Sequence, residues 1–343
     1  MECITIKDVA RVCGVGVSTV SRAINNHPDI NPETKEMIMQ VIKENNYVPN
    51  NSARNLKRSD ARAIAILIKG ISNQFFNSMI KVFEEEIQKK KYSLVLQHVD
   101  AWQDETEVAL ELEKEKRLRG IIFLGGIASH SQEQLKKIPV PFVLSTVSLL
   151  GKEYKNDYSF VSVDDVKESC RMTEHLISQG NEKIALLCSH KNDVSIGALR
   201  LTGYKKALEA HNIPVDERRI RHMDPELDNY SMESGYRMTK ALLEEGVDCT
   251  AIFAISDSLA IGAVRALIDA GKRVPMDISV AGFDGTEMAA YYNPSITTIR
   301  QPAETMARET IKLLFDSIKK KTNVQQLIFE GELVPGESVK KLN

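Results

Sequence analysis

The chain has 343 residues, more than one hydrophobic core usually serves, so its length predicts two to three packed units. With 43% hydrophobic and 27% charged residues, the composition is that of an ordinary globular protein, which excludes long disordered tracts and fibrous repeats. The net charge of -2 hides a local asymmetry, because residues 51–62 carry four Lys or Arg against one Asp. Such an excess suits contact with phosphate, and a solvated linker is the alternative interpretation.

Membrane insertion and secretion are both disfavoured by the sequence. No window reaches the roughly 18 uncharged apolar residues that a spanning helix needs, and acidic residues interrupt the opening stretch MECITIKDVARVCG, where a signal peptide would be apolar. The five cysteines are widely scattered and form no CxxC pair, so neither a disulfide framework nor a zinc ribbon fits. We therefore expect a cytoplasmic protein with no membrane partner.

The first fifty residues predict three short helices. Thr5 and Asp8 resemble a capping box for the first helix, which Gly14 ends. A second helix is expected over residues 16–25 after a short turn, and a third begins at Asn31, followed by a proline at the first helical position. A helix, a tight turn and a second helix form the arrangement that lays a helix in the DNA major groove, although small helical hairpins without that role are common.

After a polar, basic stretch the pattern changes at residue 63. Short apolar runs typical of buried strands now alternate with amphipathic helical segments; the runs cover residues 64–68, 93–97, 120–125, 141–145, 183–188, 250–255 and 278–283. Such alternation predicts parallel sheets covered by helices on both faces, and seven or more strands suggest two sheets.

The residues that the second helix would expose indicate contact with DNA bases. Arg22 can make a bidentate contact to guanine and Val17 can touch a thymine methyl group, whereas Val20 faces inward. A solvated surface arginine is the alternative interpretation of Arg22.

At this point the chain resembles a known family. The stretches ITIKDVARVCGVGVSTVSRAIN and INPETKEMIMQVIKENNYVPNNSARNL are similar to the DNA-binding headpiece of the lactose and galactose repressor family of bacterial transcription factors. The likeness continues through SNQFF, IALLC, RLTGYKKAL, AIFAISDSLAIGAV, ISVAGFD and NPSITTIRQPAETMA. The resemblance implies a small all-α helix-turn-helix headpiece followed by an α/β core like that of periplasmic binding proteins. Two parallel-sheet subdomains make up that core, three crossing strands join them, and the effector lies between them.

The resemblance also implies a division of the chain. The helix-turn-helix domain is expected over residues 1–49 and a hinge over residues 50–60. The amino-terminal core subdomain would comprise residues 61–160 with 302–325, and the carboxy-terminal one residues 161–298 with 326–343.

Carried over by position, the DNA contacts fall in two segments. In the second helix, the resemblance assigns base reading to Val17, Ser18 and Arg22, and phosphate contact to Thr19, Ser21 and Asn25. In the hinge, it assigns DNA contact to Asn50, Ala53 and Leu56. Leu56 would insert into the minor groove and bend the duplex, and a linker leucine packed on the core is the alternative.

The effector contacts are expected in the crevice beyond the carboxyl ends of the strands. They are Phe75, Thr146, Arg200, Ser256, Asp257, Asp284 and Gln301. Acidic groups beside an arginine favour a polyhydroxylated ligand, most simply a sugar. Two of these residues have alternative roles, since Phe75 could be a core phenylalanine and Asp257 is in part a helix cap.

Departures from the family pattern leave the identity of the effector open. Gly16 stands where a capping serine is usual, Ser256 replaces an asparagine, and Thr146 with Val147 stands where an Asp-Arg pair is common. The glycine should cost only tenths of a kcal/mol, on the order of the difference between cap residues.

The sequence thus predicts a sequence-specific DNA-binding regulator, most simply a repressor, that binds palindromic operator DNA as a homodimer and responds allosterically to a small effector. No dinucleotide, Walker, GxSxG or HxxxH motif is present, so we expect no enzyme, no cofactor and no metal site. The alternatives are a sugar-binding protein without a DNA role and an α/β enzyme. Whether a protein corepressor binds the amino-terminal subdomain, and whether the effector releases or recruits the protein, stays open.

Overall fold

The computed structural model describes residues 4–24, 27–45, 47, 62–70, 72–100, 103–126, 132–147, 158–224, 230–320 and 324–341. The chain divides into two compact units, residues 1–61 and 62–343, each of which is described by itself. Among the described residues, no helix combines the length and the apolar character that crossing a bilayer requires.

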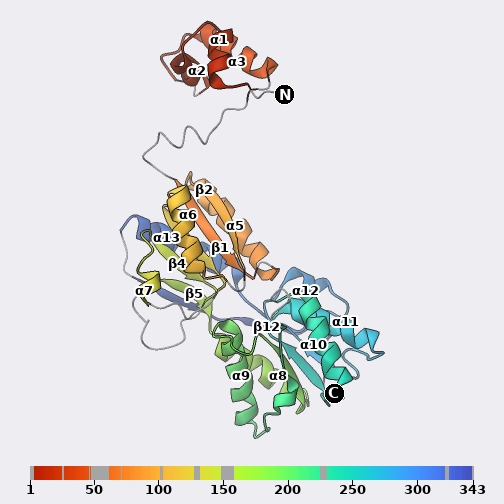
Figure 1. The fold of residues 1–343 in the computed structure, drawn as a ribbon. Helices are drawn as coiled ribbons and strands as arrows, with labels where there is room; N and C mark the ends of the chain where they lie inside the picture. Colours follow the sequence, from red (N-terminus) through yellow and green to blue (C-terminus); the bar gives the residue numbers. More distant parts are fainter. Residues whose placement is uncertain are drawn as a thin grey trace. The chain divides into compact units, whose positions relative to one another are not determined.

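The first unit is a three-helix headpiece. Its helices are α1 (Ile6–Val12), α2 (Val17–Ile24) and α3 (Pro32–Glu44), shown in red in Figure 1. The predicted capping box is confirmed, since Thr5 Oγ1 accepts a hydrogen bond from Asp8 N and Asp8 Oδ2 accepts one from Thr5 N. Asn31 caps α3 as predicted. One small core holds the helices together, and its buried members are Val9, Ala10, Val20, Ala23 and Ile38.

The first sheet of the second unit has six parallel strands in the order β11-β5-β4-β3-β1-β2. Their bounds are β1 Ala63–Lys69, β2 Ser93–Val99, β3 Gly120–Leu124, β4 Phe142–Ser145, β5 Phe160–Val163 and β11 Gln326–Phe329. Helices α5 (Phe75–Lys89) and α13 (Ala303–Ile318) pack against one face of this sheet. Helices α6 (Glu105–Lys116) and α7 (Gln132–Leu135) complete this part of the chain. Both faces of β1 are buried, as the continuous apolar run predicts.

The second sheet has four parallel strands in the order β7-β6-β8-β9. The strands are β6 Ile184–Cys188, β7 Ile220–His222, β8 Ala251–Ala254 and β9 Ser279–Ala281. Helix α8 (Asp165–Ser178) packs on α9 (Ile196–Ala210), and α10 (Met232–Glu244) packs on α11 (Asp257–Asp269), so that two helix pairs flank the strands (Figure 1). The short η2 (Glu217–Arg219) and α12 (Glu287–Tyr291) complete the lobe.

The chain passes between the two sheets three times. It leaves β5 for α8, returns through β10 (Thr298–Arg300) to α13, and leaves β11 for β12 (Glu332–Val334), which pairs antiparallel with β10. All seven predicted strands are present, and β5, β7, β10, β11 and β12 are additional. Because β5 and β11 pair with the first sheet, the boundary expected at residues 160 and 161 falls inside β5. The proposed subdomain limits therefore stay a prediction.

Candidate functional site

One face of α2 presents side chains that can reach a nucleic acid. Val17, Ser18 and Arg22 are exposed, with Val17 at 42%, whereas Thr19 and Ser21 are half-buried. In a helix, positions i, i+1, i+4 and i+5 share one side, so residues 17, 18, 21 and 22 form a single face opposite the buried Val20 and Ala23. The structure thus brings together the expected base-reading residues.

The turn between α1 and α2 sets the angle at which this face is held. Gly14 has a φ of 65° and ends α1, a left-handed conformation that favours glycine. The Gly16 carbonyl accepts hydrogen bonds from Thr19 N at 2.9 Å and Val20 N at 3.2 Å, which starts α2. A Cβ on Gly16 would lie 3.5 Å from Ser18 Oγ, in ordinary contact. A serine would therefore fit at this position.

The other expected DNA contacts lie outside the described residues. These are Asn25 at the end of the second predicted helix and the three hinge residues Asn50, Ala53 and Leu56. Their assigned roles stay predictions.

In the second unit, a buried arginine organises a cluster of polar side chains. Arg200 projects from α9, and its guanidinium lies over the Phe283 ring with Cζ 3.7 Å from the centroid. Its Nε donates to Asp165 Oδ1 at 2.9 Å and its Nη1 donates to the Ile255 carbonyl at 2.5 Å. The same Nη1 lies 3.6 Å from Asp284 Oδ1. One buried cation therefore stands between two buried carboxylates from different elements.

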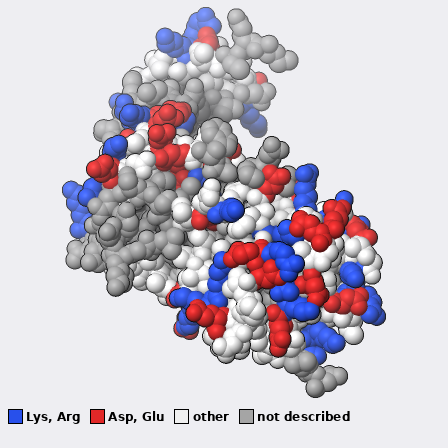
Figure 2. Space-filling model, turned by 60° about the horizontal axis from the view of Figure 1, so that its bottom comes forward, with Lys and Arg blue, Asp and Glu red and all other residues white. Residues whose placement is uncertain are grey.

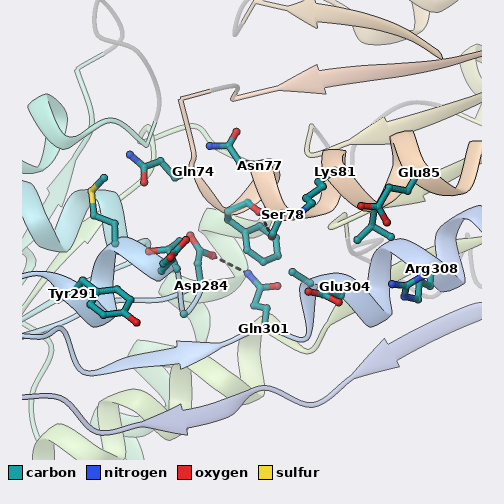
Figure 3. Close-up of a pocket in the computed structure, with 17 residues that line it drawn as sticks. Gln74, Asn77, Ser78, Lys81, Glu85, Asp284, Tyr291, Gln301, Glu304 and Arg308 are labelled. Atoms are coloured by element: carbon teal, nitrogen blue, oxygen red, sulfur yellow. Dashed lines mark hydrogen bonds between the residues drawn. The ribbon is translucent and has the colours of Figure 1, made fainter. Parts of the chain in front are cut away.

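Asp284 is held in a strained conformation beside a crossing strand. Its φ of 124° is unusual for a residue with a side chain, and such strain concentrates at binding sites. Gln301 Nε2 donates to Asp284 Oδ1 at 2.8 Å, and Gln301 N donates to the Asp284 carbonyl at 3.0 Å (Figure 3). The residue after the second sheet is thus fixed to the segment that leads to α13.

Two carboxylate oxygens of this cluster lack a hydrogen-bond partner. They are Asp165 Oδ2 and Asp284 Oδ2, each on a residue only 2% exposed. A buried acceptor without a donor is costly, and native proteins rarely retain one without a functional reason. Both residues line a small cavity of about 10 Å³, here named the inner compartment, which Thr146, Phe75 and Gln301 also line. That volume holds one water-sized group.

A larger cavity opens directly from the inner one. This outer compartment has a volume of about 230 Å³ and shares Asn73, Phe76 and Ile196 with the inner compartment. The first lobe contributes residues that follow β1 and β3, and the second lobe contributes residues 189–196 together with Met223 and Tyr230. Both compartments lie at the carboxyl ends of parallel strands, where α/β proteins bind ligands.

A third hollow, of about 820 Å³, lies on the other side of the Asp284–Gln301 pair. Figure 3 shows Gln74, Asn77 and Lys81 from α5 facing it, with Glu304 and Arg308 from α13. Phe75, Asp284 and Gln301 line both this groove and the inner compartment. They form the wall between the two spaces.

The expected effector residues do not all reach a cavity. Phe75, Thr146, Arg200, Asp284 and Gln301 line the inner compartment, and Thr146 Oγ1 also accepts a hydrogen bond from Gly125 N at 3.0 Å. Ser256 and Asp257 line none of the three hollows. Ser256 caps α11 by accepting from Leu259 N.

Asp257 has its acceptors filled by protein. It receives hydrogen bonds from Thr286 N at 2.7 Å, Thr286 Oγ1 at 3.0 Å and Thr298 Oγ1 at 2.6 Å. These bonds tie α11 to the segment that carries Asp284 and to strand β10. Asp257 is therefore placed to position its neighbours rather than to touch a ligand.

Burial controls the ionisation of the acidic cluster. Loss of hydration raises the pKa of Asp284 to about 7; Arg200 opposes this shift and Asp257 adds to it. Burial likewise raises the pKa of Asp257 to about 6, against the hydrogen bonds from Thr298 and Thr286. The pKa of Asp165 is raised by burial too, although Arg200 lowers it in part. The cluster consequently gains and loses protons near neutral pH.

The sequence analysis missed several residues that line the compartments. Asp165, Asn73, Phe76 and Tyr230 were not assigned to the site. Asp165 had a usable signal, because it follows β5 directly in the run VSVDD and so lies at the carboxyl end of a parallel strand. Tyr230 had no such signal, since it precedes α10 and approaches the cavity only through the fold.

The described part of the chain offers no group of three or more His, Cys, Asp or Glu arranged to hold a metal ion. On the face shown in Figure 2, basic and acidic side chains are interspersed over the second unit. Ion pairs such as Arg221 with Glu245 and Arg273 with Asp277 illustrate this mixing. This face does not carry the extended basic surface that nonspecific binding to a nucleic acid requires.

Comparison with known proteins agrees with this architecture. Residues 5–50 match the family model described as bacterial regulatory proteins, lacI family, and residues 173–339 match that of a periplasmic binding protein-like domain. The HTH-type transcriptional regulator MalR of Clostridium butyricum is 42% identical over 97% of this chain and 98% of its own length. These likenesses confirm the predicted headpiece and two-sheet core.

Two solved structures extend the comparison over the full length. A complex of the transcriptional regulator CelR with cellobiose is 29% identical, with a TM-score of 0.71 over 98% of this chain and 99% of its own. The lac repressor dimer bound to operator and the anti-inducer ONPF is 26% identical, with a TM-score of 0.72 over the same shares. Both units of the chain therefore have counterparts in intact regulators.

Proposed function

The chain belongs to the lacI family of bacterial regulatory proteins, and we propose that it is a homodimeric repressor whose operator affinity is set by a carbohydrate bound between its two lobes. Members of this family are DNA-binding transcription regulators rather than enzymes. The observation that carries the effector part of the proposal is the pair of unsatisfied carboxylate oxygens of Asp165 and Asp284 beside Arg200. They need donors, and the hydroxyl groups of a sugar supply them.

The reading face of α2 supports the DNA part of the proposal. Arg22 and Val17 would contact base edges in the major groove, while Ser18, half-buried Thr19 and Ser21 would reach the edge of the groove and its phosphates. A homodimer presents two such faces to a palindromic site, so that each half-site is read once. We assign Asn25, Asn50 and Ala53 to backbone contact and Leu56 to the minor groove, on the resemblance alone.

Coupling between the two units requires only a shift in populations. A ligand that binds one closure of the lobes better than another favours that closure, and in a dimer this changes how two headpieces are presented to DNA. The Asp284–Gln301 bonds suit this role, because they join the ligand cavity to a strand that crosses between the lobes. A regulator that reads operator DNA works in the cytoplasm, which is where we propose that the protein acts.

The proposal is tested with the full chain and a random duplex library, from which repeated selection yields the operator. Binding to the selected duplex, measured by fluorescence anisotropy, should fall or rise at least fivefold when the effector sugar is added. A protein that binds no duplex with sequence preference would contradict the repressor assignment and favour a sugar-binding protein without a DNA role.

The salt dependence of DNA binding separates these two functions independently. A protein that contacts phosphates releases counterions, so its affinity falls steeply with salt concentration, whereas a sugar-binding protein has no such dependence. Control by a protein corepressor remains the alternative mode of regulation. It predicts that substitutions in the inner compartment leave operator affinity unchanged under all conditions.

A further inference from the structure

The outer compartment is the feature that the proposed function does not yet use. It adjoins the acidic inner compartment, yet its walls are largely apolar and come from both lobes, with Phe76 on one side and Val194, Ile196, Met223 and Tyr230 on the other. None of these five residues follows from the sequence motifs. The inner compartment is too small for a sugar ring, so the body of any ligand that reaches Asp165 and Asp284 must lie in the outer compartment.

Two glycines keep the floor of the outer compartment free of side chains. Gly70 and Gly125 have φ values of 87° and 70°, which favour glycine. A Cβ on Gly70 would lie 4.0 Å from both Phe76 Cε2 and Tyr230 Cδ2, so the two aromatic rings flank this residue from opposite lobes. At Gly125 a Cβ would lie 2.6 Å from the Lys69 carbonyl and 3.0 Å from Phe76 Cζ. Side chains at either position would fill the space between the rings.

The ionic groups around the two compartments do not favour an anion. Lys69 is matched by Glu105, whose Oε2 accepts from its Nζ at 2.9 Å. In the outer compartment Asp193 adds a negative charge, which Ser195 N and Oγ bind. In the inner compartment one guanidinium faces two carboxyl groups. Acceptors outnumber cations in both spaces.

We propose that the outer compartment is the ring subsite for an uncharged sugar. One ring lies between Phe76 and Tyr230, with its apolar face against them, and its hydroxyl groups donate to Asp165 Oδ2 and Asp284 Oδ2 in the inner compartment. The proposal rests on the proposed function and specifies its ligand: a neutral sugar rather than a sugar phosphate or a nucleobase. Val194, which is 43% exposed, marks the side on which the compartment meets solvent. A glycosidic substituent on the bound ring leaves through this side.

The test is isothermal titration calorimetry of the full chain with a fixed panel of probes. The neutral probes are D-glucose, maltose and cellobiose, and the competing classes are represented by glucose 6-phosphate and hypoxanthine. At least one neutral sugar should bind ten times more tightly than both competitors. A phosphorylated sugar or a purine that binds most tightly would overturn the inference and leave the proposed repressor intact. Absence of binding by every probe would overturn it too.

A substitution that fills the outer compartment identifies where the ring lies. Val194→Trp should weaken binding of the preferred neutral sugar at least tenfold, because the indole occupies the opening of the ring subsite. The control is Val215→Trp, at a position 38% exposed that lines none of the three hollows. This variant should bind the sugar as the unmodified chain does. An unchanged affinity in Val194→Trp, with its melting temperature also unchanged, would place the ligand elsewhere.

Folding of the inner compartment is checked by a third variant. Asp284→Asn keeps the shape of the side chain and removes its charge, so sugar binding should weaken at least tenfold, while binding to the selected operator duplex stays measurable. If this variant binds neutral sugar as tightly as the unmodified chain, Asp284 does not receive the ligand hydroxyl groups and the inference fails.

Discussion

The two units of this protein place their working side chains in opposite environments. In the headpiece, Val17, Ser18 and Arg22 stand on the surface of a helix whose other side holds a small core. In the second unit, Asp165, Arg200 and Asp284 are buried and bonded to one another. The same residue type therefore does different work in the two places: Arg22 is free to meet DNA, and Arg200 sustains the structure that surrounds a ligand.

Truncation of the buried arginine should have the largest effect. Arg200→Ala removes the cation between two carboxylates, and a buried charge left without its partner costs about 3–5 kcal/mol. Urea unfolding of the second unit, followed by circular dichroism, should show a loss of this order. A variant of unchanged stability would mean that Asp165 and Asp284 take up protons and need no cation.

The matching substitution in the headpiece should leave folding alone and impair recognition. Arg22→Ala removes a bidentate base contact, which costs about 1–3 kcal/mol of operator binding, or roughly 10- to 100-fold in affinity. Binding of the effector sugar should be unchanged, since the headpiece and the second unit form separate compact units. Equal weakening on the selected operator and on random duplex would instead assign Arg22 to phosphate contact.

Effector binding should depend on pH, whereas headpiece folding has no buried acid to provide such dependence. Ligand hydroxyl groups favour the ionised form of Asp284, whose pKa burial raises from 3.8 to about 7 against the charge of Arg200 and together with that of Asp257. Binding should therefore release protons, and sugar affinity should rise between pH 6 and pH 8 by up to about tenfold. Calorimetry in buffers of different ionisation enthalpy measures this release.

The sign of the effect on stability follows from the same groups. Because the folded state of Asp284 holds its proton more tightly than the unfolded state, its contribution to the free energy of unfolding decreases as pH rises from about 4 to 7. Asp284→Asn should flatten this decrease in urea unfolding. A curve of unchanged slope would show that Asp284 is ionised throughout.

The smallest effect is expected at the start of the recognition helix. Gly16→Ser should change headpiece stability by only a few tenths of a kcal/mol, because glycine is nearly as good a cap as serine and the site has room for the side chain. Thermal unfolding of the two proteins measures the difference. A loss above about 1 kcal/mol would show that this turn requires glycine.

The contrast between the units also explains what could be predicted from the sequence. The headpiece is built from local signals, since capping by Thr5 and Asn31 and the spacing of Val20 and Ala23 fix its helices and its exposed face. The apolar runs likewise predicted the strands of both sheets. Short strands such as β7 and β10 had no apolar run to reveal them, because their pairing is set by distant parts of the chain.

The cavity was harder to predict for the same reason. Arg200, Asp284 and Gln301 were assigned by resemblance, and the structure places them together. The acidic residue at the start of α11 was assigned in the same way, yet the fold surrounds Asp257 with donors from Thr286 and Thr298. Neighbours from distant segments decide whether a buried carboxylate is filled or free, and no local pattern records them.

Reciprocal titration of the full chain tests most directly whether the headpiece responds to the ligand cavity. Operator affinity is measured with and without saturating neutral sugar, and sugar affinity with and without saturating operator duplex. Linkage requires that both affinities change by the same factor, which we predict to be at least fivefold. Tight binding of both partners with no mutual effect would contradict control of the headpiece by the cavity.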